Sequence, residues 1–293
     1  LINTSWGGTI IEAWTSKEAF ERSDEFKSLY GEVSFADKQA AAEKEGKPLS
    51  PNSYPAILFN GMINPLIPFA IKGAIWYQGE SNALRAIQYR KAFPLMIQDW
   101  RGRWGQGDFP FYFVQLSSYQ ANNGNSAVGS SWGELRESQT LTLGLPNTGM
   151  AVTMDIGASM DIHPRNKQDV GARLAAIALR RDYGGNMEYS GPIYQSMQVE
   201  GNKIRLSFSH AANGFMVKDK YGYLKGFEIA GSDQRFQYAK AYIENNQVVV
   251  YNDNIASPVA VRYGWADDMP EVNLYNKEGF PASPFRTDKW KGI

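Results

Sequence analysis

The stretch Ile71-Lys-Gly-Ala-Ile-Trp-Tyr-Gln-Gly-Glu-Ser-Asn82 decides the fold. Its first seven residues are a short run of mainly apolar residues rich in β-branched and aromatic side chains, which is typical of a buried strand, and Gly79 ends the run. Residues 83–100 follow with apolar side chains at a helical spacing. The order strand, loop, helix is that of an α/β unit.

The same alternation extends over the chain up to residue 183. Residues 1–9 resemble the middle of a strand and its following loop, and further strands are predicted at 109–116 and 150–154. Helical patterns cover residues 15–45, where Ser16 is the expected N-cap, and also residues 135–141 and 168–183. Strands that alternate with helices predict a parallel sheet covered on both faces.

The pattern changes at Gly184-Gly185. From Gly191 onward the chain has short alternating strands such as 203–208 and 247–251, separated by Asn/Gly turns such as Glu244-Asn-Asn246. These features predict a smaller antiparallel β domain. We therefore expect an α/β domain over residues 1–186 and the β domain over residues 187–293.

Composition excludes several classes of function. The 293 residues contain 30 basic and 30 acidic side chains, so no net field attracts nucleic acid or an anionic membrane surface. Cysteine is absent, which removes disulfides, thiolate metal sites and a cysteine nucleophile. No apolar run approaches the roughly 20 residues of a membrane-spanning helix. A neutral or weakly charged substrate is the natural expectation.

The loop after the third expected strand carries the sharpest chemical signal. The chain has two histidines, and His163 lies between a strand and a helix, where a proton carrier is expected. Asp161 could orient its imidazole as a triad acid does, and Asp155 at the strand end competes for that role. Locally, Asp161 could instead cap the following helix, with His163 a partly buried loop residue. His210 is interpreted as a surface or turn residue.

Two other loops could complete such a site. Gly7 and its neighbour Gly8 could let the backbone aim an N–H group into an oxyanion hole, or could simply form a tight turn. Gln78 carries an amide that can donate to an oxyanion, next to Gly79, whereas ionised Glu80 can only accept. Candidates for contact with substrate hydroxyls are Glu80, Asn82 and Arg165, although Glu80 could also be a solvated loop carboxylate.

Read together, these segments resemble a known family of enzymes. The segments that carry the resemblance are Trp6-Gly-Gly-Thr-Ile-Ile-Glu-Ala-Trp14, Gly73-Ala-Ile-Trp-Tyr-Gln-Gly-Glu-Ser-Asn82, Phe111-Tyr-Phe-Val-Gln-Leu116, Leu135-Arg-Glu-Ser-Gln139, Asp161-Ile-His-Pro-Arg-Asn-Lys167, Arg262-Tyr-Gly-Trp265, Asn273-Leu-Tyr-Asn276 and Pro284-Phe-Arg-Thr-Asp288. In this order they look like landmarks of the sialate O-acetylesterases, a branch of the SGNH (GDSL-like) hydrolases.

The resemblance implies hydrolysis of acetyl esters on a sugar or glycan, such as sialate or acetylated xylan. It also implies a flavodoxin-like three-layer catalytic domain, no metal or organic cofactor, and a secreted or periplasmic location. By motif, Gly7 matches the second-block oxyanion glycine, Gln78-Gly79 lies in the third block, and His163 with Asp161 matches the final block. The family usually has its acid three residues before the histidine, where this chain has Met160. Asp155 therefore stays open as the acid.

The family's first block, a Gly-Gln-Ser-Asn-like strand end with the nucleophilic serine, does not occur in this sequence. The resemblance places it before Leu1, and the chain opens without a Met or a signal peptide. We expect an upstream segment of the same protein to supply the serine, so that this chain alone is inactive.

Two other interpretations stay open. Gly79-Glu-Ser-Asn-Ala83 approximates a G-x-S-x-G elbow, which would make Ser81 the nucleophile of an α/β-hydrolase-like esterase. Alternatively, the eight tryptophans and sixteen tyrosines could belong to a sugar-binding or assembly module without catalysis.

Overall fold

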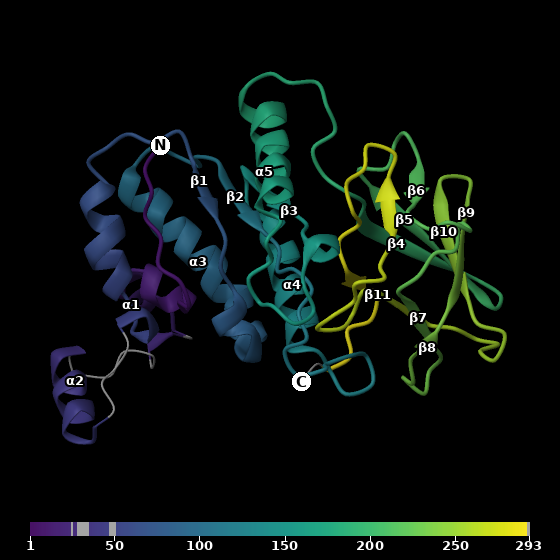
Figure 1. Cartoon of the computed structure of the whole chain (residues 1–293), viewed down its shortest axis with the longest axis horizontal. Helices are drawn as coiled ribbons and strands as arrows, with labels where there is room; N and C mark the ends of the chain where they lie inside the picture. Colours follow the sequence, from purple (N-terminus) through teal and green to yellow (C-terminus); the bar gives the residue numbers. More distant parts are fainter. Residues whose placement is uncertain (25, 28–34, 47–50, 292–293) are drawn as a thin grey trace.

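The computed structural model describes residues 1–24, 26–27, 35–46 and 51–291 (Figure 1). The first part of the chain alternates helices with three strands. Its elements are η1 (Ile11–Trp14), α1 (Lys17–Arg22), α2 (Phe35–Lys44), η3 (Pro51–Ser53), η4 (Phe59–Ile63), η5 (Asn64–Leu66), β1 (Ala74–Trp76), η6 (Glu80–Arg85), α3 (Ala86–Trp104), β2 (Phe111–Val114), α4 (Ser131–Leu141), η7 (Thr142–Gly144), β3 (Thr148–Ala151), η8 (Met154–Ile156) and α5 (Lys167–Asp182).

The three strands form a parallel sheet in the order β1-β2-β3. Alternate side chains point to opposite faces, as the strand period requires. Trp76, Phe111 and Phe113 pack with Phe93 of α3 on one face. Tyr112 and Val114 join the cluster that includes Ile177 of α5 on the other. The α/β class and the helices on both faces of the sheet are confirmed.

The second part is built from antiparallel strands, green to yellow in Figure 1. Its strands are β4 (Ile193–Glu200), β5 (Lys203–Ser209), β6 (Phe215–Val217), β7 (Phe227–Ala230), β8 (Gln237–Tyr238), β9 (Lys240–Glu244), β10 (Gln247–Tyr251), β11 (Ala260–Tyr263), β12 (Leu274–Asn276) and β13 (Phe285–Arg286). They pair as β4-β5-β10-β9, β13-β11-β7-β8 and β12-β6. Asn245 and Asn246 have φ of 50° and 58°, so the turn read from the sequence is a two-residue hairpin turn with both centres left-handed.

The predicted opening strand is wrong. Residues 1–10 form no strand, and Leu1 and Ile2 are exposed. A strand needs a neighbour to satisfy its backbone N–H and C=O groups, and none lies beside these residues in the described part of the chain. The predicted helical region 15–45 is two helices, α1 and α2, with residues 25 and 28–34 outside the described residues. Ser16 caps α1 as expected, because its Oγ accepts from Ala19 N at 3.2 Å.

One buried arginine joins the two parts of the chain. The Arg136 side chain on α4 is fully buried, and its guanidinium donates to four carbonyl oxygens. Leu116 and Ser117, just after β2, accept at 2.8 and 2.7 Å. Ala266 and Asp267, after β11, accept at 2.6 and 2.9 Å. Five donors in a planar fork suit this arrangement, which one lysine ammonium could not reproduce.

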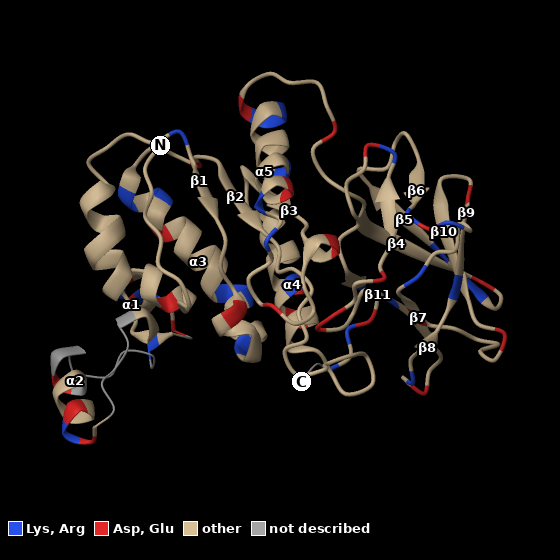
Figure 2. Cartoon of the chain, in the orientation of Figure 1, with Lys and Arg blue, Asp and Glu red and all other residues tan. Residues whose placement is uncertain are grey.

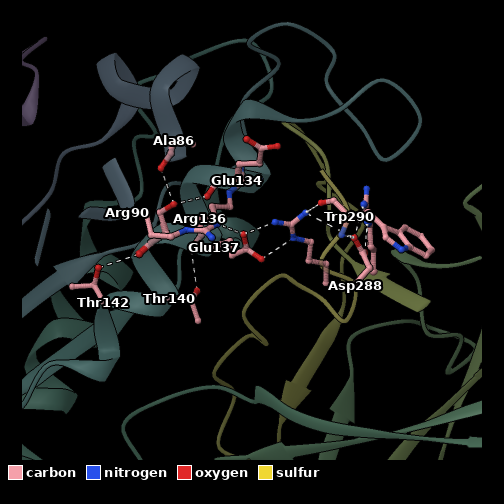
Figure 3. Close-up of polar contacts among 12 residues, drawn as sticks. Ala86, Arg90, Glu134, Arg136, Glu137, Thr140, Thr142, Asp288 and Trp290 are labelled. Atoms are coloured by element: carbon pink, nitrogen blue, oxygen red, sulfur yellow. Dashed lines mark hydrogen bonds and ion pairs between the residues drawn. The ribbon is translucent and has the colours of Figure 1, made fainter. Parts of the chain in front are cut away.

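Further contacts tie α4 to the β strands. Glu137 accepts two hydrogen bonds from Arg286, at 2.8 and 2.9 Å, and also pairs with Arg90 of α3. Figure 3 shows Glu137 between Arg90 on one side and the segment of Asp288 and Trp290 on the other. Charges of both signs lie on both parts of the molecule (Figure 2). No helix in the described ranges is long and apolar enough to cross a bilayer.

We predict that Arg136→Lys destabilises the protein strongly. Lysine leaves some of the four buried carbonyl oxygens without a donor, and the loss should be on the order of 3 kcal/mol. Urea unfolding followed by tryptophan fluorescence measures it. Arg235→Lys, at an exposed position, is the control. An Arg136→Lys midpoint equal to that of the control would contradict the role of the guanidinium.

Candidate active site

Three loops meet at the carboxyl edge of the parallel sheet, where sites of open α/β folds lie. The loop after β3 packs directly on the loop after β2: a Cβ on Gly157 would come within 2.3 Å of the Ser118 carbonyl oxygen. Gln120 N also donates to the Ser159 carbonyl at 2.9 Å. The third loop follows β1, and β1 pairs with β2 in register. The edge therefore holds two of the three segments that the sequence singled out, those after β1 and after β3.

The loop after β1 depends on Gly79. This residue has φ of +152°, and an added Cβ would lie 2.7 Å from the Leu135 side chain of α4. Gln139, one helical turn further on, donates to the Gln78 carbonyl at 3.3 Å. Glycine is thus required both by the backbone conformation and by the close approach of α4.

Gln78 and Asn82 are occupied by a buried network. The Gln78 amide donates to the Thr9 carbonyl at 2.8 Å and to Asn82 Oδ1 at 2.7 Å. Asn82 Oδ1 also accepts from Ile11 N at 2.8 Å, and Asn82 Nδ2 donates to Glu12 at 3.0 Å. Both amide protons of Gln78 therefore have protein acceptors. This network attaches residues 9–12 to the end of β1.

Glu80 lies beside the loop after β3. Burial raises the pKa of its carboxyl group, opposed by hydrogen bonds from the backbone of Glu80 and Gly79 and by the nearby charges of His163 and Lys167. Glu80 and His163 belong to the loops after β1 and β3, at the carboxyl edge of the sheet.

His163 presents an almost free imidazole. Its side chain is 88% exposed, and Nδ1 lies 3.8 Å from Asp161 Oδ1. That oxygen accepts from His163 N at 2.9 Å, so Asp161 fixes the turn that carries the histidine. At 3.8 Å the two side chains are neighbours rather than hydrogen-bonded partners. The cap of α5 is Asn166, which accepts from Asp169 N at 3.1 Å, so the alternative in which Asp161 caps that helix is wrong.

Asp155, the competing acid, is engaged elsewhere. Arg173 of α5 binds it through two hydrogen bonds at 2.6 and 2.8 Å. Tyr275 of β12 donates its hydroxyl to the same carboxylate at 3.0 Å. Both oxygens are therefore used, and Asp155 connects the α/β part to the β strands.

The remaining candidates differ in exposure. Gly7 is open, with nothing within 4 Å of an added Cβ, and no acceptor for its N–H lies in the described part of the chain. Arg165 is exposed. Ser81 is exposed in the first turn of η6, and no hydrogen bond joins it to His163 in the described ranges.

The second histidine, His210, follows β5 and pairs with Glu188 at 2.8 Å. No group of three His, Asp or Glu side chains among the described residues could hold a metal.

Sequence reasoning missed Tyr77 and Ser117. Burial raises the pKa of Tyr77, with Ser117 as hydrogen-bond partner and Glu80 as a nearby charge, so this hydroxyl lies at the same edge. Lys167 lies 5.4 Å from the centre of the Tyr77 ring. Their positions in the sequence could have revealed them, because Tyr77 directly precedes Gln78 and Ser117 follows the second strand.

The raised pKa of Glu80 predicts a pH-dependent stability. A carboxyl group whose pKa is higher in the folded state binds its proton more tightly there, so stability falls as pH rises above the ordinary value of 4.5 toward the raised pKa. Glu80→Gln should therefore raise the unfolding midpoint relative to wild type at pH 7 and not at pH 4. Thermal unfolding across this range measures the difference. Glu271→Gln, at an exposed position, should show none, and a Glu80→Gln gain that is the same at both pH values would refute the assignment.

Comparison with known proteins identifies the family of the chain. The model of the carbohydrate esterase family of sialic acid-specific acetylesterases matches residues 1–180. A sialate O-acetylesterase of Homo sapiens is 32% identical over 319 residues, covering 97% of this chain and 56% of the relative. That of Mus musculus is 31% identical over 328 residues, covering 97% and 59%.

A solved carbohydrate acetylesterase from Xanthomonas citri is 41% identical, with a TM-score of 0.85 over 98% of this chain and 60% of that one. The chain thus spans less than two thirds of the length of these relatives. The order of the motifs, the parallel sheet with its antiparallel partner, and these matches agree. The chain belongs to the carbohydrate esterase family of sialic acid-specific acetylesterases.

Proposed function

We propose that the chain forms the greater part of a carbohydrate O-acetylesterase in which His163 transfers the proton. The observation that carries the proposal is the exposed imidazole in the loop after β3, 3.8 Å from Asp161. A serine Oγ attacks the acetyl carbonyl carbon while His163 takes its proton, and the sugar oxygen leaves with that proton. Water then releases acetate from the serine by the same steps in reverse.

The serine itself is proposed to come from polypeptide that precedes Leu1. Within the described residues, no serine hydroxyl hydrogen-bonds to the imidazole. Ile75, at the centre of β1, is 66% exposed, and β1 pairs only with β2 in the described sheet. Strands of parallel sheets are normally covered on both faces. The free edge of β1 supports a further strand at this place.

The oxyanion is proposed to bind at Gly7. Its N–H is open, whereas the Gln78 amide would have to release the Thr9 carbonyl or Asn82 to donate. Gln78 and Asn82 then act as positioning residues that hold residues 9–12, and Gly79 shapes the loop. Glu80 and Arg165 are left to contact sugar hydroxyls. An acetylated neutral or sialylated glycan and a secreted or periplasmic location complete the proposal.

The test is acetyl release from 4-nitrophenyl acetate by four proteins. They are residues 1–293 alone, the same chain with its upstream segment, and the latter with His163→Ala or Ser81→Ala. We expect activity only when the upstream segment is present, no effect of Ser81→Ala, and a loss of about a thousandfold or more with His163→Ala.

Circular dichroism shows whether each protein is folded. Near-normal turnover of a folded His163→Ala protein would overturn the proton-transfer role. Robust activity of residues 1–293 that disappears with Ser81→Ala would show that Ser81, in the elbow Gly79-Glu-Ser81, is the nucleophile instead of an upstream serine.

Substitutions of Asp161 and Asp155 should have different effects on turnover and on stability. We predict that Asp161→Asn lowers turnover much more than Asp155→Asn, since both oxygens of Asp155 are already bound to Arg173 and Tyr275. Asp155→Asn should instead lower thermal stability, because it leaves a buried guanidinium without its carboxylate. Steady-state kinetics and thermal unfolding measure the two effects. The opposite order of turnover in folded proteins would transfer the acid role to Asp155.

A further inference from the structure

A cavity of about 270 Å³ lies where α4 meets the β strands. The loop before α4, the first turn of α4, β11 and the C-terminal segment form its walls. We call it the interdomain pocket; the lining residues used below are Ser126, Glu134, Phe236, Arg262, Trp265 and Trp290. Its size is that of a sugar unit rather than of a larger cofactor, and interfaces between domains are common places for ligand sites.

Aromatic rings and guanidinium groups alternate in its wall. The Arg262 guanidinium lies 4.1 Å from the centre of the Phe236 ring and 5.4 Å from that of Trp265. The Phe236 and Trp290 rings are 5.5 Å apart. The Arg286 guanidinium lies 5.0 Å from the centre of the Trp265 ring. Apolar ring surface beside planar hydrogen-bond donors suits the mixed C–H and O–H surface of a pyranose.

The two guanidinium groups in this wall are already paired, whereas Lys291, which also lines the pocket, is exposed. Arg262 donates to Asp288 at 2.9 and 3.0 Å, and Arg286 donates to Glu137 at 2.8 and 2.9 Å. Asp288 and Glu137 lie on either side of the gap between α4 and the C-terminal segment (Figure 3). A guanidinium with its own carboxylate has little to offer an anion. The part of the pocket beside the two arginines is therefore suited to a neutral ligand.

Trp290 is held in place without being buried. Its backbone N–H donates to Asp288 at 3.2 Å, and its backbone carbonyl accepts from Arg286 at 2.9 Å. The ring is half-buried and lines the pocket. The backbone bonds and the Phe236 ring restrict the motion of the Trp290 side chain, which lowers the entropy lost when a ligand binds against it.

The wall of the pocket continues to the catalytic edge. Gln120 bonds to Ser159 in the histidine loop, and the same segment runs on to Ser126 at the pocket. On α4, Glu134 lines the pocket, and the adjacent residue Leu135 packs against Gly79. One loop and one helix thus contact both places.

We propose that the interdomain pocket binds one neutral sugar unit of the same glycan whose acetyl ester is bound near His163. This inference rests on the proposed function, since it makes the pocket a second contact for that substrate. A substrate bound at two points is fixed more tightly than one held at the acetyl group alone.

The experiment uses the full-length protein and calorimetric titration with xylotetraose, cellotetraose, chitotetraose and lactose, all neutral, and with 3′-sialyllactose. Trp290→Ala is compared with Tyr221→Ala, which removes a 72% exposed ring outside the pocket. We expect at least one neutral sugar to bind, and Trp290→Ala to weaken it about fivefold or more. Tyr221→Ala should leave binding unchanged, and neither variant should alter turnover of 4-nitrophenyl acetate, which has no sugar.

Three results would overturn the proposal. They are no binding of any neutral sugar, binding unaffected by Trp290→Ala, or a Trp290-dependent preference for 3′-sialyllactose over lactose. Binding that depends on Trp290 in a protein without esterase activity would keep the pocket and remove the catalytic proposal. Esterase activity without sugar binding would keep the catalytic proposal and remove the pocket as a sugar site.

Discussion

The placement of α4 depends on the Arg136 guanidinium, which is buried without a carboxylate in direct contact. Burial lowers the pKa of Arg136, and the charges of Asp267 and Asp268 oppose this effect. The cost of burying this cation is offset by four carbonyl groups that accept its hydrogen bonds, two just after β2 and two after β11. A buried cation is tolerated only when its donors are satisfied in this way. The position of α4 relative to both sheets is thereby fixed.

The residues on either side of Arg136 in α4 contact different parts of the molecule. Leu135 packs against Gly79 and so determines the path of the loop after β1. Glu137, one residue beyond Arg136 and on another side of the helix, holds Arg286 and Arg90. Asp267 closes the arrangement, because its side chain accepts from Ser130 Oγ at 2.6 Å and from Gly124 N at 2.9 Å. The carboxyl edge of the parallel sheet and the antiparallel strands are therefore positioned by the same helix.

The sequence predicted what depends on local pattern. The strands at 203–208 and 247–251, the Asn245-Asn246 turn and the Ser16 cap follow from periodicity and turn chemistry, and all are present. Partners far apart in sequence were not predictable: Asn82 bonds to Ile11 and Glu12, and Asp155 to Tyr275. Residues 1–9 have a strand-like sequence but no neighbouring strand, so pattern alone misassigned them.

Ile75 bears on how the proposed serine segment would act. Covering a side chain of this size is worth about 1.5–3 kcal/mol, and a strand added at the edge of β1 would also satisfy its backbone groups. A segment that binds the folded chain and not the unfolded one stabilises it by mass action. Under the proposed mechanism, the contact that delivers the nucleophile also completes the sheet. Catalytic competence and stability would then be gained together, because both depend on the same uncovered strand.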